Sequence, residues 1–243
     1  MWSKRTARDD DLVSRADLGK DPEAVASMFD AVARRYDLVN DLLSLGRTKA
    51  WRKKVVKIIA PRPGMKILDI AAGPGSSSEP LHKAGAEVIA MDFSEGMLAV
   101  GKKKRPYLNF VKGDALKLPF PDNTFDVTTI SFGLRNTRDY EKALRESLRV
   151  TKIGGRMVIV EFSTPTFFIF KKIYMNYLMK LLPKIAKRTA SNPEAYVYLA
   201  ESIRAWPDQG ALAAKMSANG WQNPSWTNLT GGVVAVHTGI KGS

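Results

Sequence analysis

Two glycines and a later aspartate have the types and spacing of a nucleoside-binding site. Gly73 and Gly75 come directly after residues 66–72, a short and mostly apolar run typical of a strand buried on both faces. Because glycine has no β-carbon, its backbone can turn sharply and let a ligand approach closely. A second apolar run, residues 88–91, ends in Asp92, whose carboxylate would accept hydrogen bonds from the hydroxyls of a ribose. Together these residues indicate a nucleoside-bearing cofactor.

The position three residues after Gly75 helps to choose between cofactors that contain a ribose. A dinucleotide-binding fingerprint has a third glycine there, whereas this chain has Ser78. S-adenosylmethionine has a ribose and an adenine but no phosphate, so the short G-x-G with a downstream acid fits it better. The motif alone also fits a tight strand-to-helix turn that binds no ligand, and on these residues that alternative stays open.

The composition excludes several kinds of chemistry. The 243 residues include no cysteine, which rules out disulfides, thiolate metal ligands and a cysteine nucleophile. The two histidines, His82 and His237, are far apart in the sequence, so no zinc or non-haem iron site is predicted. Catalysis must therefore depend on a cofactor, on carboxylates, or on arginine and tyrosine side chains.

The net charge of +14 predicts an anionic partner. Residues 164–190 hold six basic side chains and no acidic one, interleaved with aromatic residues and methionines. As a helix, this segment would have a basic face and an opposite apolar face. The basic face would hold Lys172, Asn176, Lys180 and Lys184, and the apolar face would hold Tyr174, Met175, Leu178, Leu181 and Leu182. This pattern is typical of a helix in a lipid interface, and a lid helix with its lysines in water would share it. We expect residues 164–190 to contact a membrane surface.

The sequence contains no signal for export or for a membrane span. No run of eighteen or more predominantly apolar residues occurs, and residues 1–14 lack the apolar core of a signal peptide. We therefore expect a cytoplasmic protein that is at most peripheral at the inner face of the membrane.

The remaining pattern places these residues on an α/β framework. We expect residues 1–20 to be a disordered leader, residues 21–63 a helical lid, and residues 64–243 one domain in which residues 164–206 are inserted, substrate- or membrane-facing helices. Strands are predicted at 66–72, 86–91, 108–112, 124–131, 156–162, 222–228 and 233–238, and further helices near 78–84, 94–104, 139–150 and 208–218. Alternating strands and helices indicate a mostly parallel sheet, and the short turn at Gly231-Gly232 makes the last two strands an antiparallel hairpin.

Five stretches together resemble a known family. They are residues 28–46, 69–75, 118–136, 161–165 and 196–209, of which S-F-G-L-R-N and Y-V-Y-L-A-E-S-I are the most specific. The chain resembles the ubiquinone/menaquinone biosynthesis C-methyltransferases (UbiE/MenG type) over roughly residues 22–241. The resemblance implies a class I S-adenosylmethionine-dependent methyltransferase fold, Rossmann-like, and methyl transfer to a ring carbon of a prenylated quinol.

The resemblance also implies which residues contact the cofactor. Carried over by position, they are Gly73, Pro74 and Gly75 in the turn, Asp92 at the ribose, Asp114 and Ala115 beside the adenine, and Ser131 at the end of the fourth strand. The family usually has threonine where this chain has Pro74, so only the carbonyl remains as a contact there.

The chemistry of the ring points to a second group of residues. A quinol carbon is nucleophilic only while the adjacent hydroxyl loses its proton, and a cation beside a phenol with a pKa of about 10 favours the phenolate. Arg135 directly follows the fourth strand, at the sheet edge where ligands bind, and we expect it to be that cation unless a salt bridge, for example to Asp37 or Asp139, occupies it. Asn136 would orient the ring. Tyr36 and Tyr198 would pass a proton or hold an oxygen, with plain packing as the alternative for Tyr198.

Two other functions remain to be weighed. The positive charge would also suit a methyltransferase acting on RNA. We expect no nucleic-acid partner, however, because the basic excess is concentrated in an aromatic, amphipathic segment and no RRM signature is present. A non-catalytic S-adenosylmethionine-binding protein is the other alternative, motivated by Pro74. Within the resemblance, residues 161–165 favour demethylmenaquinol over a benzoquinol precursor, and a homodimer stays open.

Overall fold

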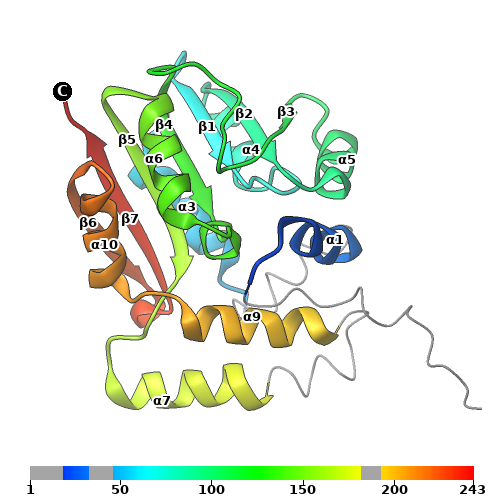
Figure 1. The fold of residues 1–243 in the computed structure, drawn as a ribbon, viewed down its shortest axis with the longest axis vertical. Coiled ribbons are helices and arrows are strands. Elements are labelled where there is room, and N and C mark those ends of the chain that lie inside the picture. Colours follow the sequence, from blue (N-terminus) through cyan, green and yellow to red (C-terminus); the bar gives the residue numbers. More distant parts are fainter. Residues whose placement is uncertain (1–18, 33–45, 182–192) are drawn as a thin grey trace, which may run out of the picture.

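A computed structural model describes residues 19–32, 46–181 and 193–243, and all structural statements below concern these residues. Tyr36 and Asp37 lie outside them. Figure 1 shows a twisted sheet with helices on both faces and further helices below one edge. Within the described residues the strands are β1 (Lys66–Ile70), β2 (Glu87–Asp92), β3 (Asn109–Lys112), β4 (Phe125–Ser131), β5 (Thr151–Phe162), β6 (Trp221–Leu229) and β7 (Val234–Lys241).

The strands form one sheet in the order β3-β2-β1-β4-β5-β7-β6. β1 to β5 are parallel, and β7 runs antiparallel to both β5 and β6. The chain order reverses between β1 and β4, and ligands of open parallel sheets bind beyond the carboxyl ends of the strands at such a point. The predicted fold class, a mostly parallel sheet with an antiparallel C-terminal pair, is confirmed.

The helices cover the two faces of the sheet and its carboxyl edge (Figure 1). They are α1 (Pro22–Val32), α3 (Thr48–Ile59), α4 (Ser78–Lys83), α5 (Glu95–Lys104), η3 (Leu134–Asn136), α6 (Tyr140–Val150), α7 (Phe168–Asn176), η4 (Tyr177–Leu181), α9 (Pro193–Ala205), α10 (Gln209–Ala218) and η5 (Thr230–Gly232). None of the helices in the described ranges combines the length and the hydropathy that crossing a bilayer requires.

Successive strand residues pack on opposite sides of the sheet, because side chains alternate along a strand. Ile67 of β1 and Val158 of β5 belong to the core under α3 and α4. Their chain neighbours Leu68 and Ile159 belong to the core under α6 and α10. All four side chains are fully buried, so the central strands read as continuous apolar runs.

The segment after β5 crosses the carboxyl edge of the sheet as α7 and η4, and α9 lies between it and the sheet (Figure 1). Tyr174 of α7 and Leu178 of η4 are buried in the same core as Leu199 of α9. The exposed face of α7 differs from the prediction: Phe168, Ile169 and Ile173 are 81, 74 and 61 % exposed, and they share that face with the exposed Lys172 and Asn176. The predicted separation of Lys172 and Asn176 from the buried Tyr174 and Leu178 is confirmed, but the exposed face also carries apolar side chains that the prediction did not include. Lys184 and Leu182 lie outside the described residues.

Candidate active site

A cavity of about 120 Å³ opens where the carboxyl ends of β1, β2 and β4 meet. Gly73 after β1, Asp92 at the end of β2 and Asn136 of η3 line it, together with the loop that follows β3. Val25 and Ala26 of α1 form part of its wall, so the first described helix lies over the opening. The sheet edge, the four segments that follow β1 to β4, and α1 therefore build one site at the switch point.

Asp92 ties two of these loops together. Its Oδ2 accepts a hydrogen bond from the Gly73 N–H at 2.7 Å, and its Oδ1 accepts one from the Ser94 N–H at 2.8 Å. Burial raises the pKa of this carboxyl, while the bonds from Ser94 and Gly73 oppose the rise. A carboxylate has about four lone-pair positions, so Asp92 can still accept hydrogen bonds from a ligand in the cavity. This geometry suits the expected ribose contact.

The glycine turn contributes less to the cavity than its motif predicts. Gly73 lines the cavity, but Pro74 and Gly75 do not. The Pro74 carbonyl accepts a hydrogen bond from Arg105 Nη1 at 2.9 Å. At Gly75, which has φ +81°, a β-carbon would lie 2.9 Å from side-chain atoms of both Leu108 and Phe110. Gly75 is needed for its left-handed backbone and for packing against the β3 region, and the cofactor contacts of Pro74 and Gly75 stay a prediction.

Two residues after β3 line this cavity, whereas the last residue of β4 lines another one. Asp114 and Ala115 line the first cavity, and Asp114 Oδ1 accepts a hydrogen bond from the Leu116 N–H at 2.8 Å. Ser131 lines a second cavity of about 50 Å³ between α3 and the sheet. Thr129, two residues earlier on the same face of β4, lines that second cavity too, and the cofactor contact of Ser131 stays a prediction.

Arg135 has surroundings that the sequence does not predict. Its Nη1 donates to Glu161 Oε2 at 3.0 Å and to the Phe132 carbonyl at 2.8 Å, and its side chain and that of Glu161 are 5 and 1 % exposed. The guanidinium lies 5.3 Å from the centre of the Phe162 ring and does not line the cavity. An arginine whose charge a buried carboxylate already balances is not a free cation beside a phenol. This geometry supports the salt-bridge alternative over the predicted catalytic role of Arg135, with Glu161 and not Asp139 as the partner, while Asp37 lies outside the described residues.

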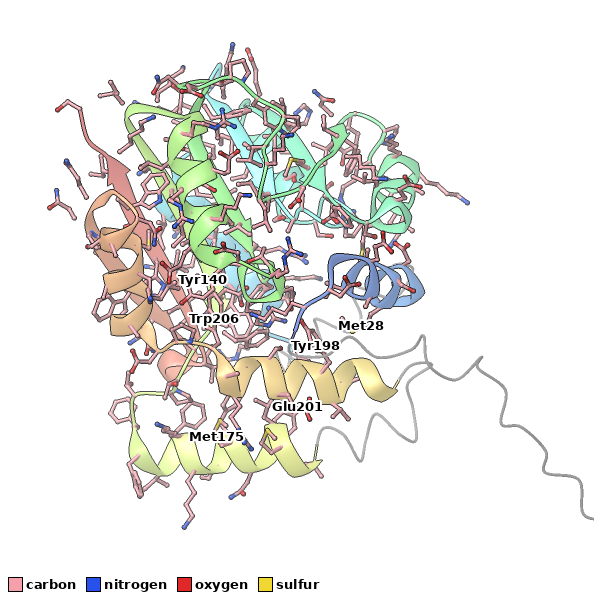
Figure 2. The ribbon with its side chains drawn as sticks, viewed as in Figure 1. Met28, Tyr140, Met175, Tyr198, Glu201 and Trp206 are labelled. Atoms are coloured by element: carbon pink, nitrogen blue, oxygen red, sulfur yellow. The ribbon has the colours of Figure 1, made fainter. Side chains whose placement is uncertain are left out.

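Asn136 and Tyr198 do come together. The Tyr198 hydroxyl donates to Asn136 Oδ1 at 3.2 Å, and Asn136 Nδ2 donates to the Phe132 carbonyl at 3.2 Å. In Figure 2, Tyr198 of α9 and Met28 of α1 point toward one another between the two helices, and both belong to one small buried cluster. A chain of contacts thus runs from Arg135 through the Phe132 carbonyl to Asn136 and Tyr198 beside the cavity.

Helix α1 is held over the site by Asp30. Its Oδ1 accepts a hydrogen bond from the Gly96 N–H at 3.0 Å and another from the Ser94 hydroxyl. Gly96 leaves room for this contact, because a β-carbon there would lie 2.6 Å from Asp30 Oδ1. Ser94 therefore contacts Asp92 through its amide and Asp30 through its hydroxyl, which couples the position of α1 to the floor of the site.

Asp69 lies fully buried beneath the glycine turn. Its Oδ2 accepts hydrogen bonds from Ser77 Oγ at 2.7 Å and Ser78 Oγ at 2.6 Å, and its Oδ1 has no partner among the described residues. Burial raises its pKa to about 6, although the two serine hydroxyls oppose the rise. At neutral pH the charged form is therefore held at a cost in stability.

Replacing Asp69 with asparagine should change how stability depends on pH. The pKa of Asp69 in the folded protein is above the unfolded value of 3.8. Ionisation of Asp69 therefore destabilises the wild type as the pH rises from about 4, and this loss of stability is complete above about 6. Asp69→Asn keeps an acceptor for the serines and should be more stable than the wild type by up to about 3 kcal/mol at pH 7. Urea unfolding at several pH values measures this, with the exposed Asp122→Asn as the control. An Asp69→Asn gain that is equal at pH 4.5 and pH 7 would contradict the assignment.

Three residues at the site were not predicted from the sequence. Lys20 lines the cavity just before α1, in what we expected to be a leader. Phe132 lines both cavities and has φ +58°, a backbone conformation that non-glycine residues rarely adopt. Glu161 balances Arg135. Two signals were available: Phe132 belongs to the specific stretch S-F-G-L-R-N, and Glu161 belongs to the stretch 161–165.

The sheet and its ligand-edge cavity define the class of protein. The chain resembles the solved structure of an S-adenosylmethionine-dependent methyltransferase from Thermotoga maritima, with TM-score 0.65 and 19 % identity, covering 89 % of this chain and 99 % of that one. It also resembles one from Aquifex aeolicus, with TM-score 0.56 and 19 % identity, covering 78 % and 88 %. The fold is that of the S-adenosylmethionine-dependent methyltransferases.

Sequence comparison gives the family. A profile of the ubiE/COQ5 methyltransferase family matches residues 17–241, and the chain belongs to this family. A relative from Streptomyces avermitilis is 58 % identical over 229 residues, 94 % of this chain and 99 % of its own length. One from Mycobacterium marinum is 56 % identical over 94 % of this chain and 98 % of its own length. Both relatives are named demethylmenaquinone methyltransferase.

Proposed function

We propose that this chain transfers a methyl group from S-adenosylmethionine to a ring carbon of demethylmenaquinol, in menaquinone biosynthesis. The match to relatives of that name along nearly the whole length of both chains carries the proposal. The cavity is consistent with it, because a ribose acceptor, Asp92, and Asn136, the hydrogen-bond partner of Tyr198, both line it.

The residues lining the cavity fit this cofactor. Asp92 would accept from the ribose hydroxyls, and Met91, Met97 and Leu116 offer an apolar surface for adenine beside Asp114. No phosphate has to be held, which agrees with a glycine turn whose later members face away from the cavity. When bound, the cofactor supplies an electrophilic methyl group.

The protein's own contribution is orientation and exclusion of water. Methyl transfer needs the ring carbon in line with the S–CH₃ bond, so a fixed ring matters more than an acid or a base. The Tyr198 hydroxyl donates to Asn136, which lines the cavity, and this pair would hold a ring hydroxyl. Arg135 acts as a positioning residue, because it and Asn136 both donate to the Phe132 carbonyl. Helix α1 keeps water out above them.

An acceptor panel tests the proposed function. Purified protein with methyl-labelled S-adenosylmethionine is offered a short-chain demethylmenaquinol, a matched benzoquinol, or tRNA. The tRNA arm tests the alternative that the +14 charge favours. We expect label in the naphthoquinol at a rate at least tenfold above the benzoquinol, and none in tRNA. Labelled tRNA with unlabelled quinols would replace the proposal by RNA methylation.

We further propose that α7 rests on the membrane in which a prenylated substrate resides. Phe168, Ile169 and Ile173 are exposed on one face, and the exposed Lys171 and Lys172 lie beside them. Apolar side chains flanked by lysines suit the interface of an anionic bilayer, where each basic residue adds about 1 kcal/mol.

Introducing negative charge on this exposed face of α7 should weaken membrane binding. We expect Ile169→Glu/Ile173→Glu to reduce sedimentation with anionic phospholipid vesicles at least tenfold, because two carboxylates would enter the lipid interface. Ile153→Glu is the matched control, since Ile153 is 63 % exposed on β5, away from α7. Turnover of a water-soluble, short-chain quinol should stay unchanged in both variants. Equal sedimentation of the two would remove α7 from the membrane contact.

A further inference from the structure

The proposed reaction needs a positive charge near the ring hydroxyl, and Arg135 does not provide it. Its guanidinium is balanced by Glu161 and does not line the cavity. Among the described residues, two basic side chains do line the cavity, those of Lys20 and Arg138. Arg138 is exposed to solvent, where water screens its charge, whereas Lys20 is partly buried.

Lys20 lines the cavity close to the start of α1. It lies two residues before Pro22, the first residue of α1, and has φ +54°, so the backbone turns there before it enters the helix. Its Nζ lies 5.9 Å from the centre of the Trp206 ring, at the end of α9. Figure 2 shows Trp206 beside Tyr140, and the two rings meet edge to face with centres 5.2 Å apart. Packed rings therefore fix the surface over which the ammonium lies.

The charges around Lys20 leave its ammonium available to a ligand. No carboxylate among the described residues forms a salt bridge with it, and its ammonium lies over the Trp206 ring. Burial lowers the pKa of Lys20, as does the nearby guanidinium of Arg135, while the Glu161 carboxylate raises it. A partly desolvated ammonium without a counter-ion gains most from an anionic oxygen placed beside it. Asp92 and Asp114, which also line the cavity, are acidic and suit the nucleoside.

We propose that the Lys20 ammonium faces the ring hydroxyl of the quinol and stabilises its phenolate, an inference that rests on the function proposed above. The hydroxyl proton leaves to water, and the ring gains electron density. The new C–C bond takes its electron pair from the ring as the S–CH₃ bond breaks with its pair staying on sulfur. The same ring carbon then loses its proton to water, which restores the aromatic ring. Lys20 stays protonated throughout.

A chromogenic phenol tests this charge without any methyl transfer. The probe is 4-nitro-1-naphthol, whose anion absorbs at longer wavelength than the neutral form, titrated on the protein with S-adenosylhomocysteine present. We expect the pKa of the bound probe to lie at least one unit below that of the free probe in the wild type and in Lys20→Arg. In Lys20→Met the shift should be lost, whereas the exposed Lys117→Met should titrate like the wild type. A Lys20→Met protein that keeps the full shift overturns the inference.

Kinetics separate this inference from the proposed function. Lys20→Met should lower kcat for demethylmenaquinol at least tenfold, with the Kd for S-adenosylmethionine within twofold of the wild type. A weaker cofactor Kd with an unchanged probe titration would show that the ammonium holds the cofactor's carboxylate, which also overturns the inference. If the wild type methylates no quinol, the proposed function fails, and the probe titration still decides whether Lys20 stabilises a phenolate.

Discussion

Replacing Glu161 with glutamine should lower the free energy of unfolding by about 3–5 kcal/mol, because it leaves the buried Arg135 guanidinium without a counter-charge. Glu161 is 1 % exposed, and its Oε1 also accepts a hydrogen bond from the backbone N–H of Arg135 at 3.2 Å. Glutamine has nearly the same shape, so the loss would come from charge and not from packing. Urea unfolding followed by circular dichroism measures the effect.

Two further variants make this prediction specific. Glu161→Gln/Arg135→Met removes both charges and should recover most of the loss, since breaking a buried pair costs more than replacing it. Glu95→Gln breaks the exposed pair with Lys112 and should leave stability unchanged, because surface pairs contribute little. A Glu161→Gln protein within 1 kcal/mol of the wild type would contradict the buried pair described here.

Replacing Asp92 with alanine should weaken binding of S-adenosylmethionine at least a hundredfold. Two charge-assisted hydrogen bonds to the ribose would be lost, each contributing about 1.5–3 kcal/mol. The bonds that hold Gly73 and Ser94 would also be lost, so the loop would no longer be fixed. Titration calorimetry with S-adenosylmethionine and S-adenosylhomocysteine measures both affinities.

The matched control for Asp92→Ala is Asp122→Ala, which removes an exposed carboxylate paired with Arg149. It should bind the cofactor like the wild type. Asp92→Asn should fall between the two, since the amide oxygen still accepts but carries no charge. A loss of less than threefold in Asp92→Ala would mean that the ribose lies elsewhere in the cavity.

The sheet was predictable because its signals are local. Apolar runs bounded by glycine and proline identified the strands, and the short turn at Gly231-Gly232 fixed the antiparallel pair. The positions of Gly73 and Asp92 followed from the same signals, since both end a strand at the carboxyl edge. Which cavity a side chain lines at or beyond the end of a strand depends on residues that are distant in the sequence. Neither Ser131 nor Pro74 lines the larger cavity, and their cofactor contacts stay a prediction.

The partners and surroundings of the buried charged side chains were the least predictable part of the structure. Arg135 pairs with Glu161, 26 residues further along the chain, because β4 and β5 are neighbours in the sheet. The sequence alone offers several carboxylates and does not rank them. Lys20 looked like part of a polar leader, and its partial burial depends on Trp206 in a distant helix. Long-range packing decides both cases.

The central claim is that the chain methylates a ring carbon of demethylmenaquinol, and the position of a transferred label tests it most directly. Protein, [methyl-¹³C]S-adenosylmethionine and a reduced short-chain demethylmenaquinone are incubated, and the extracted quinone is examined by carbon NMR. We predict a single labelled signal at the shift of a methyl group on a ring carbon. A label at the shift of a methyl ether, or none in the quinone while the cofactor is consumed, would contradict the claim.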